Sequence, residues 1–137
     1  MRIMLDPGAF EPKRAHDTDA GLDLMAKERV KIWPGSSACI DTGVHVELPH
    51  GYYGKIESKS GLNVKHSIVS CGGTIDEPYR GSIVVKLYNF GDQAYVFQPG
   101  EKVAQLVIQP YIAPEIEISD TLSETDRGSN GFGSTGK

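Results

Sequence analysis

The sequence predicts an all-β fold of the sandwich or barrel type, and three observations support this prediction. Short stretches rich in valine, isoleucine and tyrosine recur along the chain, some with alternating apolar and polar residues, as in Glu115–Ser119. Turn-forming pairs such as Pro34-Gly35, Gly91-Asp92 and Pro99-Gly100 separate these stretches. No segment sustains the 3.6-residue apolar period of an amphipathic helix.

The first three expected strands lie in the first third of the chain. Gly21–Ala26 carries leucines two residues apart and follows an acidic turn. Arg29–Trp33 places valine and isoleucine two residues apart and stops at Pro34-Gly35, a turn signal. Val44–Leu48 again alternates apolar with polar residues, and Pro49 marks its end because proline cannot continue a ladder of hydrogen bonds.

Four further strands and one helical turn are expected after this point. The strands are Tyr52–Ser58, Ser82–Asn89, Lys102–Gln109 and Glu115–Ser119, each rich in β-branched residues or tyrosine. Ser60–His66 lies between two of them and is the one segment expected to form a short helical turn.

The chain is expected to form one domain followed by an arm. A chain of 137 residues can bury a core without disulfide bonds. After residue 119 the composition shifts to serine, threonine, aspartate and glycine, which are too polar to pack into a core. We therefore expect a β domain over residues 1–119 and a flexible arm over 120–137 that is either disordered or docked on another subunit.

Composition and charge exclude several classes of protein. The formal net charge is −4 and the isoelectric point is about 5.5, without the basic stripe that a nucleic-acid polymer would need. No apolar run is long enough for a membrane span. Cys39 and Cys71 lack metal-ligand spacing and are expected to be reduced thiols of a cytoplasmic protein. A small nucleotide bound together with a cation fits this acidic chain better than DNA does.

The last eleven residues, Arg127–Lys137, have the composition of a phosphate-binding loop. Four glycines free the backbone, hydroxyl groups supply donors, Arg127 supplies a fork for phosphate oxygens, and Phe132 supplies a flat apolar face. Gly131–Lys137 even fits the P-loop pattern G-x-x-x-x-G-K, but no helix follows to hold the phosphates. The residue types are those of a phosphate-binding loop, whereas the position at the end of the chain is typical of a mobile tail.

Two stretches in the first half of the chain contain charged residues that could take part in a site, His16–Asp23 and Glu57–Leu62. His16–Asp19 resembles the start of a calcium loop, but Gly21 stands where a side-chain ligand belongs, so a solvated turn is an equal alternative. Asp23 lies between two leucines and needs a partner, either a buried arginine or metal-bound water. Glu57–Leu62 runs from a strand into Ser-Lys-Ser-Gly, which is either a small phosphate cradle or a helix start with Ser60 as N-cap.

Two later stretches leave further alternatives open. Gly72–Gly81 is expected to form a hairpin, in which Asp76 is either a turn carboxylate or a general base, and Tyr79 either packs in the core or lies against a sugar. Gln105 interrupts an apolar strand and therefore has a specific hydrogen-bonding role, either structural or toward a ligand.

In this order and spacing, the five stretches resemble the motifs of the homotrimeric deoxyuridine triphosphatase (dUTPase) family. The match begins at Ala15–Leu24, covers nearly the whole chain, and needs no gap over Ser60–Gly81. The resemblance implies a jelly-roll-like trimer whose active sites lie at subunit contacts. Each site would combine the second and fourth motifs of one subunit, the hairpin of a neighbour and the arm of the third. A cyclic trimer is a common form of closed oligomer.

The resemblance implies hydrolysis of dUTP to dUMP and pyrophosphate, which keeps uracil out of DNA and supplies dUMP for thymidylate synthesis. Asp76 would activate the water that attacks the α-phosphorus, Mg²⁺ would bind the three phosphates, and Asp23 would contact the metal through water. The implied substrate-binding residues are Lys59, Ser60, Gly61, Ser70, Thr74, Ile75, Asp76, Tyr79, Val84, Gln105, Arg127, Phe132, Gly133, Ser134 and Thr135.

Substrate specificity would follow from shape. The main chain around Ser70 and Thr74–Asp76 would pair with the uracil edge, and Tyr79 under the deoxyribose would collide with a 2′-hydroxyl group. Phe132 would stack on the base when the arm closes. Lys59 departs from the arginine usual in the family, which turns a bidentate fork into a point charge, and Ser70 replaces the more usual asparagine or aspartate.

Two alternative functions share this fold. A dCTP deaminase relative would need an acid–base glutamate to activate water against the pyrimidine, and Glu77 is the candidate. A nucleotide-sensing binding protein would use dUTP binding to control a protein partner. Retention of Asp76 and of the whole arm argues against a pure sensor.

Overall fold

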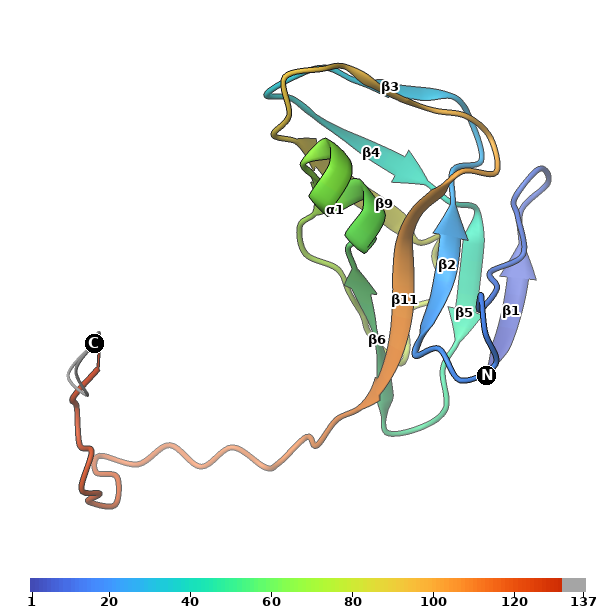
Figure 1. The fold of residues 1–137 in the computed structure, drawn as a ribbon. Coiled ribbons are helices and arrows are strands. Elements are labelled where there is room, and N and C mark those ends of the chain that lie inside the picture. Colours follow the sequence, from blue (N-terminus) through green and yellow to red (C-terminus); the bar gives the residue numbers. More distant parts are fainter. Residues whose placement is uncertain (132–137) are drawn as a thin grey trace.

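A computed structural model describes residues 1–131. The chain is a β-sandwich, and residues 111–131, which we call the arm from here on, leave the body in an extended form (Figure 1). Its one helix among these residues is short. The elements in chain order are β1 (Arg2–Leu5), β2 (Gly21–Met25), β3 (Val30–Ile32), β4 (Ser37–Asp41), β5 (Val44–Glu47), β6 (Tyr52–Glu57), α1 (Ser60–His66), β7 (Ile68–Ser70), β8 (Thr74–Ile75), β9 (Val84–Asn89), β10 (Tyr95–Phe97) and β11 (Lys102–Pro110).

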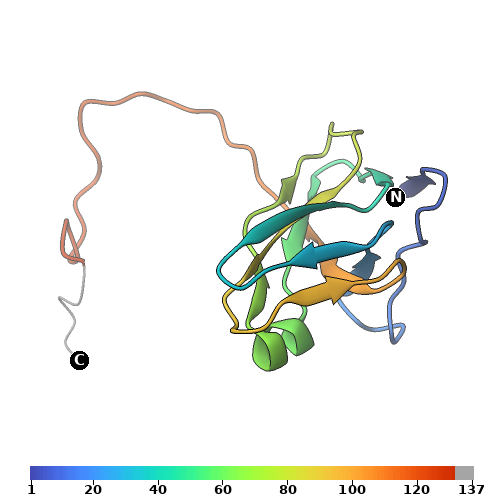
Figure 2. The ribbon, with the colours of Figure 1, turned by 90° about the horizontal axis from the view of Figure 1, so that it is seen from above.

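The strands form two larger sheets and two strand pairs, all with antiparallel neighbours. One sheet has the order β2-β11-β6-β8 and the other the order β4-β9-β7. The pairs are β1-β5 and β10-β3. Figure 2 shows α1 at one end of this body and the arm running away from it. The all-β, jelly-roll-like fold class expected from the sequence is confirmed.

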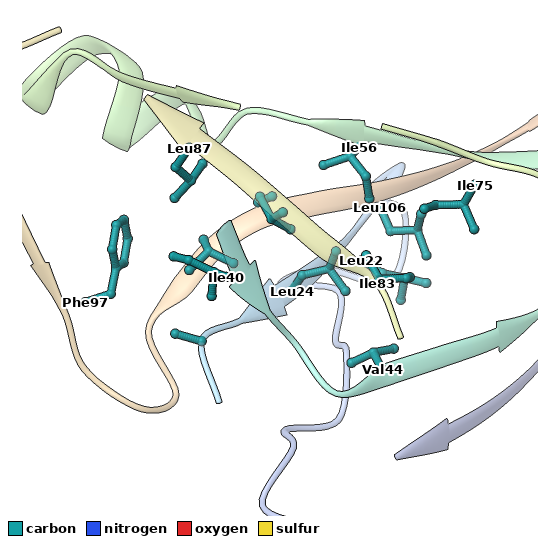
Figure 3. Packing of buried hydrophobic residues seen from close by; sticks show 14 of the residues in the cluster. Leu22, Leu24, Ile40, Val44, Ile56, Ile75, Ile83, Leu87, Phe97 and Leu106 are labelled. Atoms are coloured by element: carbon teal, nitrogen blue, oxygen red, sulfur yellow. The ribbon is translucent and has the colours of Figure 1, made fainter. Parts of the chain in front are cut away.

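The core lies between the sheets and is built by the alternation of their strands (Figure 3). In β9, Val85 and Leu87 point inward and are buried, while Lys86 between them and Tyr88 after them are partly exposed. The labelled core side chains come from both large sheets and from the neighbouring segments: Leu22, Leu24, Ile40, Val44, Ile56, Ile75, Ile83, Leu87, Phe97 and Leu106.

Six of the expected strands and the helical turn are confirmed, the helix with its predicted bounds. The strand expected over Glu115–Ser119 is wrong for the isolated chain, because the described residues offer it no pairing partner. Ile116 and Ile118 are 90% and 96% exposed. Short strands such as β1 and β10 were not predicted, because three or four residues are too few to show a period.

Strand β6 organises the functional residues, since different elements lie at its two ends. Pro110, the last residue of β11, pairs with Tyr52 at the start of β6, so the arm leaves the body there (Figure 1). The hairpin strand β8 pairs with Gly54 and Lys55 near the same end. Helix α1 begins at the other end of β6.

No helix among residues 1–131 is long and apolar enough to cross a membrane.

Candidate active site

A buried carboxylate with two lysine partners lies at the helix end of β6. Asp23 is 4% exposed, and its Oδ1 and Oδ2 atoms lie 2.5 Å from Lys59 Nζ and 2.6 Å from Lys102 Nζ. Burial alone raises the pKa of the Asp23 carboxyl, but the hydrogen bonds from Lys102 and Lys59 outweigh burial and hold this pKa below its usual range. We call these three residues the lysine cluster. The expectation that Asp23 has a partner is confirmed, but the partner is a pair of lysines and not the buried arginine or metal-bound water expected from the sequence.

The two ammonium groups of the lysine cluster remain accessible to a ligand. The Lys59 and Lys102 side chains are 26% and 52% exposed. Each ammonium has three N–H donors and uses one on Asp23, so the others can reach an anion. The two lysines line a cavity of about 240 Å³ together with Gly61, Leu62, Lys65, His66 and Tyr95. The net charge of the lysine cluster is positive, which suits phosphate.

The start of α1 forms one wall of this cavity. Lys59 is the N-cap residue and makes no side-chain capping bond, and Ser60 is the first residue of the helix. The interpretation of Ser60 as N-cap is therefore wrong. The first main-chain N–H groups of a helix lack partners within it, so those at Ser60 and Gly61 remain suited to phosphate oxygens.

Hydrogen bonds hold the neighbouring segments in place around the lysine cluster. Gln105 faces Asp23 across one strand pair and Glu57 across the other. Its side-chain Nε2 donates to the Ser58 carbonyl oxygen at 3.2 Å. The Ser58 hydroxyl oxygen accepts the Ser70 N–H at 2.8 Å and lies 3.0 Å from the Ser70 hydroxyl. Gln105 thus has a structural contact, and Ser58 places Ser70 beside the cluster.

Asp76 lies at the other end of β6, directly after β8. The hairpin expected over Gly72–Gly81 is wrong, because β8 pairs with β6 and residues 72–81 contain no second strand. We keep the word hairpin only as a name for the segment Gly72–Gly81. Thr74 and Ile75 pair with β6, and a turn closed by a 3.0 Å hydrogen bond from Tyr79 N to Asp76 O follows. Gly73, before the hairpin strand, has φ of +124° and no space for a Cβ atom, which would lie 2.7 Å from Ile56. Asp76 is exposed and lines a cavity of about 540 Å³ with Tyr53, Thr74, Glu77, Pro78 and Tyr111.

Tyr79 is held over a glycine rather than in the core. Its hydroxyl donates to the Ser82 carbonyl oxygen at 3.0 Å, and the side chain is partly exposed. A Cβ atom at Gly81 would lie 2.3 Å from the tyrosine hydroxyl oxygen, so only glycine leaves space for the ring. The ring is therefore fixed at the surface, where it can contact a ligand.

Both carboxylate oxygens of Glu77, the residue after Asp76, accept hydrogen bonds from neighbouring groups. His50 Nδ1 lies 2.9 Å from Oε1, while the Gly51 N–H and the Tyr111 hydroxyl donate to Oε2 at 2.8 and 2.9 Å. The His50 hydrogen bond, followed by those of Gly51 and Tyr111, lowers the pKa of Glu77 to about 2. A carboxyl with this pKa is a poor proton shuttle at neutral pH. This geometry disfavours the deaminase alternative.

Within residues 111–131, the hydrogen bonds between the arm and the body lie at its root. Tyr111 N donates to the Gly51 carbonyl oxygen at 3.0 Å, and the residues that follow are exposed. Arg127 Nε donates to the Asn130 carbonyl oxygen at 3.0 Å, within the arm itself. The predicted contacts of Phe132, Gly133, Ser134 and Thr135 lie outside the described residues.

The structure thus brings the predicted site residues together in two groups. Asp23, Lys59, Ser60, Gly61, Ser70 and Gln105 surround the helix end of β6, whereas Thr74, Ile75, Asp76 and Tyr79 lie at its start. Ile75 pairs with Gly54, so the next residue, Asp76, lies near Tyr53. The run from Tyr53 to Lys59 spans about 20 Å at the usual rise per residue of an extended strand. Val84 is half-exposed at the start of β9, and Arg127 joins neither group.

Sequence reasoning missed Lys102 and the positioning role of Ser58. Lys102 lies 79 positions after Asp23 in the chain (102 − 23), and only the β2–β11 register joins them. Ser58 belongs to a motif that was noted, but its partner Ser70 is visible only in the fold. A charged residue at the first position of an apolar strand was the one signal for Lys102.

The described side chains do not form a metal site of their own. Within residues 1–131, no group of three or more histidine, cysteine, aspartate or glutamate side chains is placed to hold an ion. Both oxygens of Asp23 already accept lysine ammonium groups. A divalent cation would therefore be held mainly by oxygens of the substrate and by water, which fits the oxygen-rich shell that Mg²⁺ prefers.

Comparisons with known proteins agree with one another. Residues 9–136 match the family profile described as dUTPase. The chain is 47% identical to the deoxyuridine 5′-triphosphate nucleotidohydrolase of Gloeothece citriformis, over 96% of this chain and 92% of that protein. It is 40% identical to the Mus musculus protein of the same name, over 98% of this chain and 83% of that protein. Its fold matches that of a Staphylococcus bacteriophage 80alpha dUTPase mutant (G164S) solved with dUpNHpp, with a TM-score of 0.92. The two sequences are 32% identical, and the match covers 99% of this chain and 98% of that one.

Proposed function

This chain belongs to the dUTPase family, and on that premise we propose that it hydrolyses dUTP to dUMP and pyrophosphate, with water attacking the α-phosphorus. The observation that carries the proposal is the pairing of a cationic phosphate site with an exposed carboxylate. The lysine cluster and the start of α1 supply donors for the triphosphate, and Asp76 supplies a general base.

We infer that the two halves of the site come from different subunits. A general base has to lie within hydrogen-bonding distance of its water, about 3 Å away, and that water must attack the phosphorus directly. Asp76 lies near Tyr53, at the start of β6, and the extended run from Tyr53 to Lys59 is about 20 Å long, well beyond the reach of a hydrogen bond. We therefore propose a cyclic homotrimer in which the hairpin of one subunit faces the lysine cluster of the next.

The arm supplies independent support for the trimer. Ile116 and Ile118 alternate with charged residues, which is the pattern of a strand with one buried face, yet both are exposed in the isolated chain. Pairing of Glu115–Ser119 with a neighbouring subunit would bury this face and satisfy the backbone. The residues from Arg127 onward would then reach a neighbour's substrate, with Arg127 on the γ-phosphate and Phe132 on the base.

Each group has a defined role in this scheme. Asp76 takes a proton from the attacking water, while Lys59, Lys102, Ser60 and Gly61 orient the phosphates and offset their charge. The family commonly uses a divalent metal, and we propose Mg²⁺, which would neutralise the triphosphate when bound. Asp23 orders the two lysines, and when the metal is bound it would interact with it through water rather than directly.

The reaction is tested by measuring pyrophosphate release with dUTP, dTTP, dCTP and UTP, with and without Mg²⁺. We expect turnover of dUTP with Mg²⁺ and little turnover of the other three nucleotides. Equal rates with UTP and dUTP would contradict the role of Tyr79, and ammonia release from dCTP would support a deaminase instead.

The shared site is tested by mixing two inactive variants, Asp76→Asn and Lys59→Gln. If the trimers are unfolded and reassembled at a 1:1 ratio, random assembly leaves about a quarter of the sites with both natural halves. Activity should reappear to about that extent. Mixtures that stay as inactive as the separate variants would show that each site lies within one chain.

A further inference from the structure

The ring of His45, on β5, lies between acceptors from two other segments of the chain. Nδ1 is 2.8 Å from the Arg80 carbonyl oxygen, and Nε2 is 3.0 Å from Oδ1 of Asp6. The side chain is 17% exposed. A carbonyl oxygen and an ionised carboxylate only accept hydrogen bonds, so both ring nitrogens must donate. Both carry a proton only in the imidazolium form. The arrangement therefore selects charged His45.

The Arg80 carbonyl belongs to the short loop that carries Tyr79. The Tyr79 hydroxyl bonds the Ser82 carbonyl oxygen, so residues 79–82 form a closed unit around Gly81. Two contacts tie this unit to strands of the body: His45 on the Arg80 carbonyl oxygen, and the Ser82 hydroxyl on Asp41. Tyr79 N and Arg80 Nη1 also donate to the preceding turn, at the Asp76 and Glu77 carbonyl oxygens, and the next residue, Ile83, is anchored by Val44 and Thr42. Only the His45 contact involves a group that changes charge near neutral pH.

We propose that charged His45 is a positioning residue for Tyr79 and thereby for the recognition of deoxyribose. The histidine does not reach the substrate. It holds the Arg80 carbonyl and so fixes the ring that would exclude a 2′-hydroxyl group. This proposal rests on the role given above to Tyr79, and it adds a pH dependence to substrate choice.

The charges around His45 favour its protonated form. The hydrogen bond to the Arg80 carbonyl raises the pKa of His45, burial opposes this effect, and the hydrogen bond to Asp6 adds to it. Lys27 forms ion pairs with Asp41, at 3.3 Å, and with Asp6, at 3.8 Å, so its charge partly balances these carboxylates. The other charged residues that line the cavity beside the ring are Arg2, Glu47 and Arg80.

The sign of the pH effect follows from the direction of this shift. Because the pKa is raised on folding, the stabilising contribution of His45 is complete below the ordinary histidine pKa of about 6.5. It is lost as the pH rises through the raised value. Neutral His45 keeps one N–H donor, so either the Arg80 or the Asp6 contact fails. The loop then loosens, which should weaken dUTP binding and reduce discrimination against UTP.

The kinetic test compares His45→Gln, His45→Lys and the control His16→Gln. His16 is 82% exposed and also contacts an aspartate, so its replacement controls for loss of an imidazole. We would measure KM and kcat for dUTP and UTP between pH 6 and pH 9. In the natural protein, KM for dUTP should rise and the preference for dUTP should fall toward alkaline pH.

The variants should distinguish the effect of the charge at position 45 from the effect of the shape of the side chain. At pH 6.5, His45→Gln should raise KM for dUTP about tenfold, the loss expected for one charge-assisted hydrogen bond, with little change in kcat. His45→Lys keeps a permanent charge, so it should restore binding and show less alkaline loss than the natural protein. His16→Gln should match the natural protein throughout.

A nitrogen-detected NMR titration of the histidine rings reports the state of His45 without any turnover. We expect both ring nitrogens of His45 to be protonated at pH 7. A neutral His45 at that pH would overturn the proposal. An unchanged dUTP/UTP preference in His45→Gln would do so too, provided that the natural protein itself prefers dUTP. If the natural protein shows no such preference, the proposed role of Tyr79 fails instead.

Discussion

The two ends of β6 differ in how completely one chain builds them. At the helix end, Asp23 is buried and each of its oxygens has a lysine partner, so the phosphate site is assembled within the subunit. At the other end, Asp76 is exposed and the arm that leaves beside it extends away from the body. The comparison shows that one chain orders the lysine cluster, whereas it leaves Asp76 and the arm exposed, and this difference is why we propose that the base and the arm act on a neighbouring subunit.

Replacing the base should have the largest effect on turnover. Asp76→Asn should lower kcat by about 10²- to 10⁴-fold, because the water loses its proton acceptor. Stability should not change, since the side chain is exposed. Pyrophosphate release and a thermal melt measure these two quantities. Binding of an α,β-imido analogue of dUTP should be retained, and near-normal turnover would remove Asp76 from the mechanism.

Removing the end of the arm should have the next largest effect. A chain that stops at Asp126 should remain folded and assembled, because the residues it lacks make no described contact with the core. Its turnover should fall roughly a hundredfold, as expected when groups that orient a substrate are lost. Light scattering and dUTP kinetics test the two parts. Unfolding of this shorter chain would mean that the arm is structural.

Asp23→Asn should destabilise the helix end of β6. An asparagine leaves the two lysines without a carboxylate, and loss of such charged hydrogen bonds costs about 1–3 kcal/mol. Denaturant unfolding measures this free energy, with Asp92→Asn as an exposed control. Equal stability of the two variants would show that the lysine cluster is not preorganised by Asp23.

Lys102 should contribute to triphosphate binding without contributing to the proton transfer. Lys102→Gln should raise KM for dUTP about fivefold, equivalent to about 1 kcal/mol, and Lys102→Arg should restore most of the affinity. Inhibition by dUMP, which lacks the outer phosphates, should change little. Lys86→Gln, on β9, is the matched control. An equal loss for dUMP and dUTP would argue for a merely structural lysine.

Glu77 should make a small, pH-dependent contribution to stability at the hairpin end. Its carboxyl has a folded pKa of about 2, below the usual 4.5, mainly because of the hydrogen bond from His50. Its stabilisation is therefore present above pH 4.5 and lost as the pH falls toward about 2. The difference in unfolding free energy between the natural protein and Glu77→Gln should shrink over that interval. A difference independent of pH would contradict the ionised state.

Local signals in the sequence were sufficient for the long elements and for the types of chemistry. The segment Ser60–His66 forms the helix with its predicted bounds, and the β-branched stretches form six of the expected strands. Glu115–Ser119 has an equally good strand pattern but remains unpaired in the isolated chain. A strand needs a partner, and the pattern alone does not say which chain provides it.

The sequence by itself determined the order of the motifs, the all-β class and the candidate chemical groups, because composition and spacing act over short stretches of chain. Only the tertiary structure decided which of these groups meet. The β2–β11 register brings Lys102 to Asp23, and the length of β6 keeps Asp76 away from Lys59. Both results depend on pairing between distant segments, which local preferences do not encode.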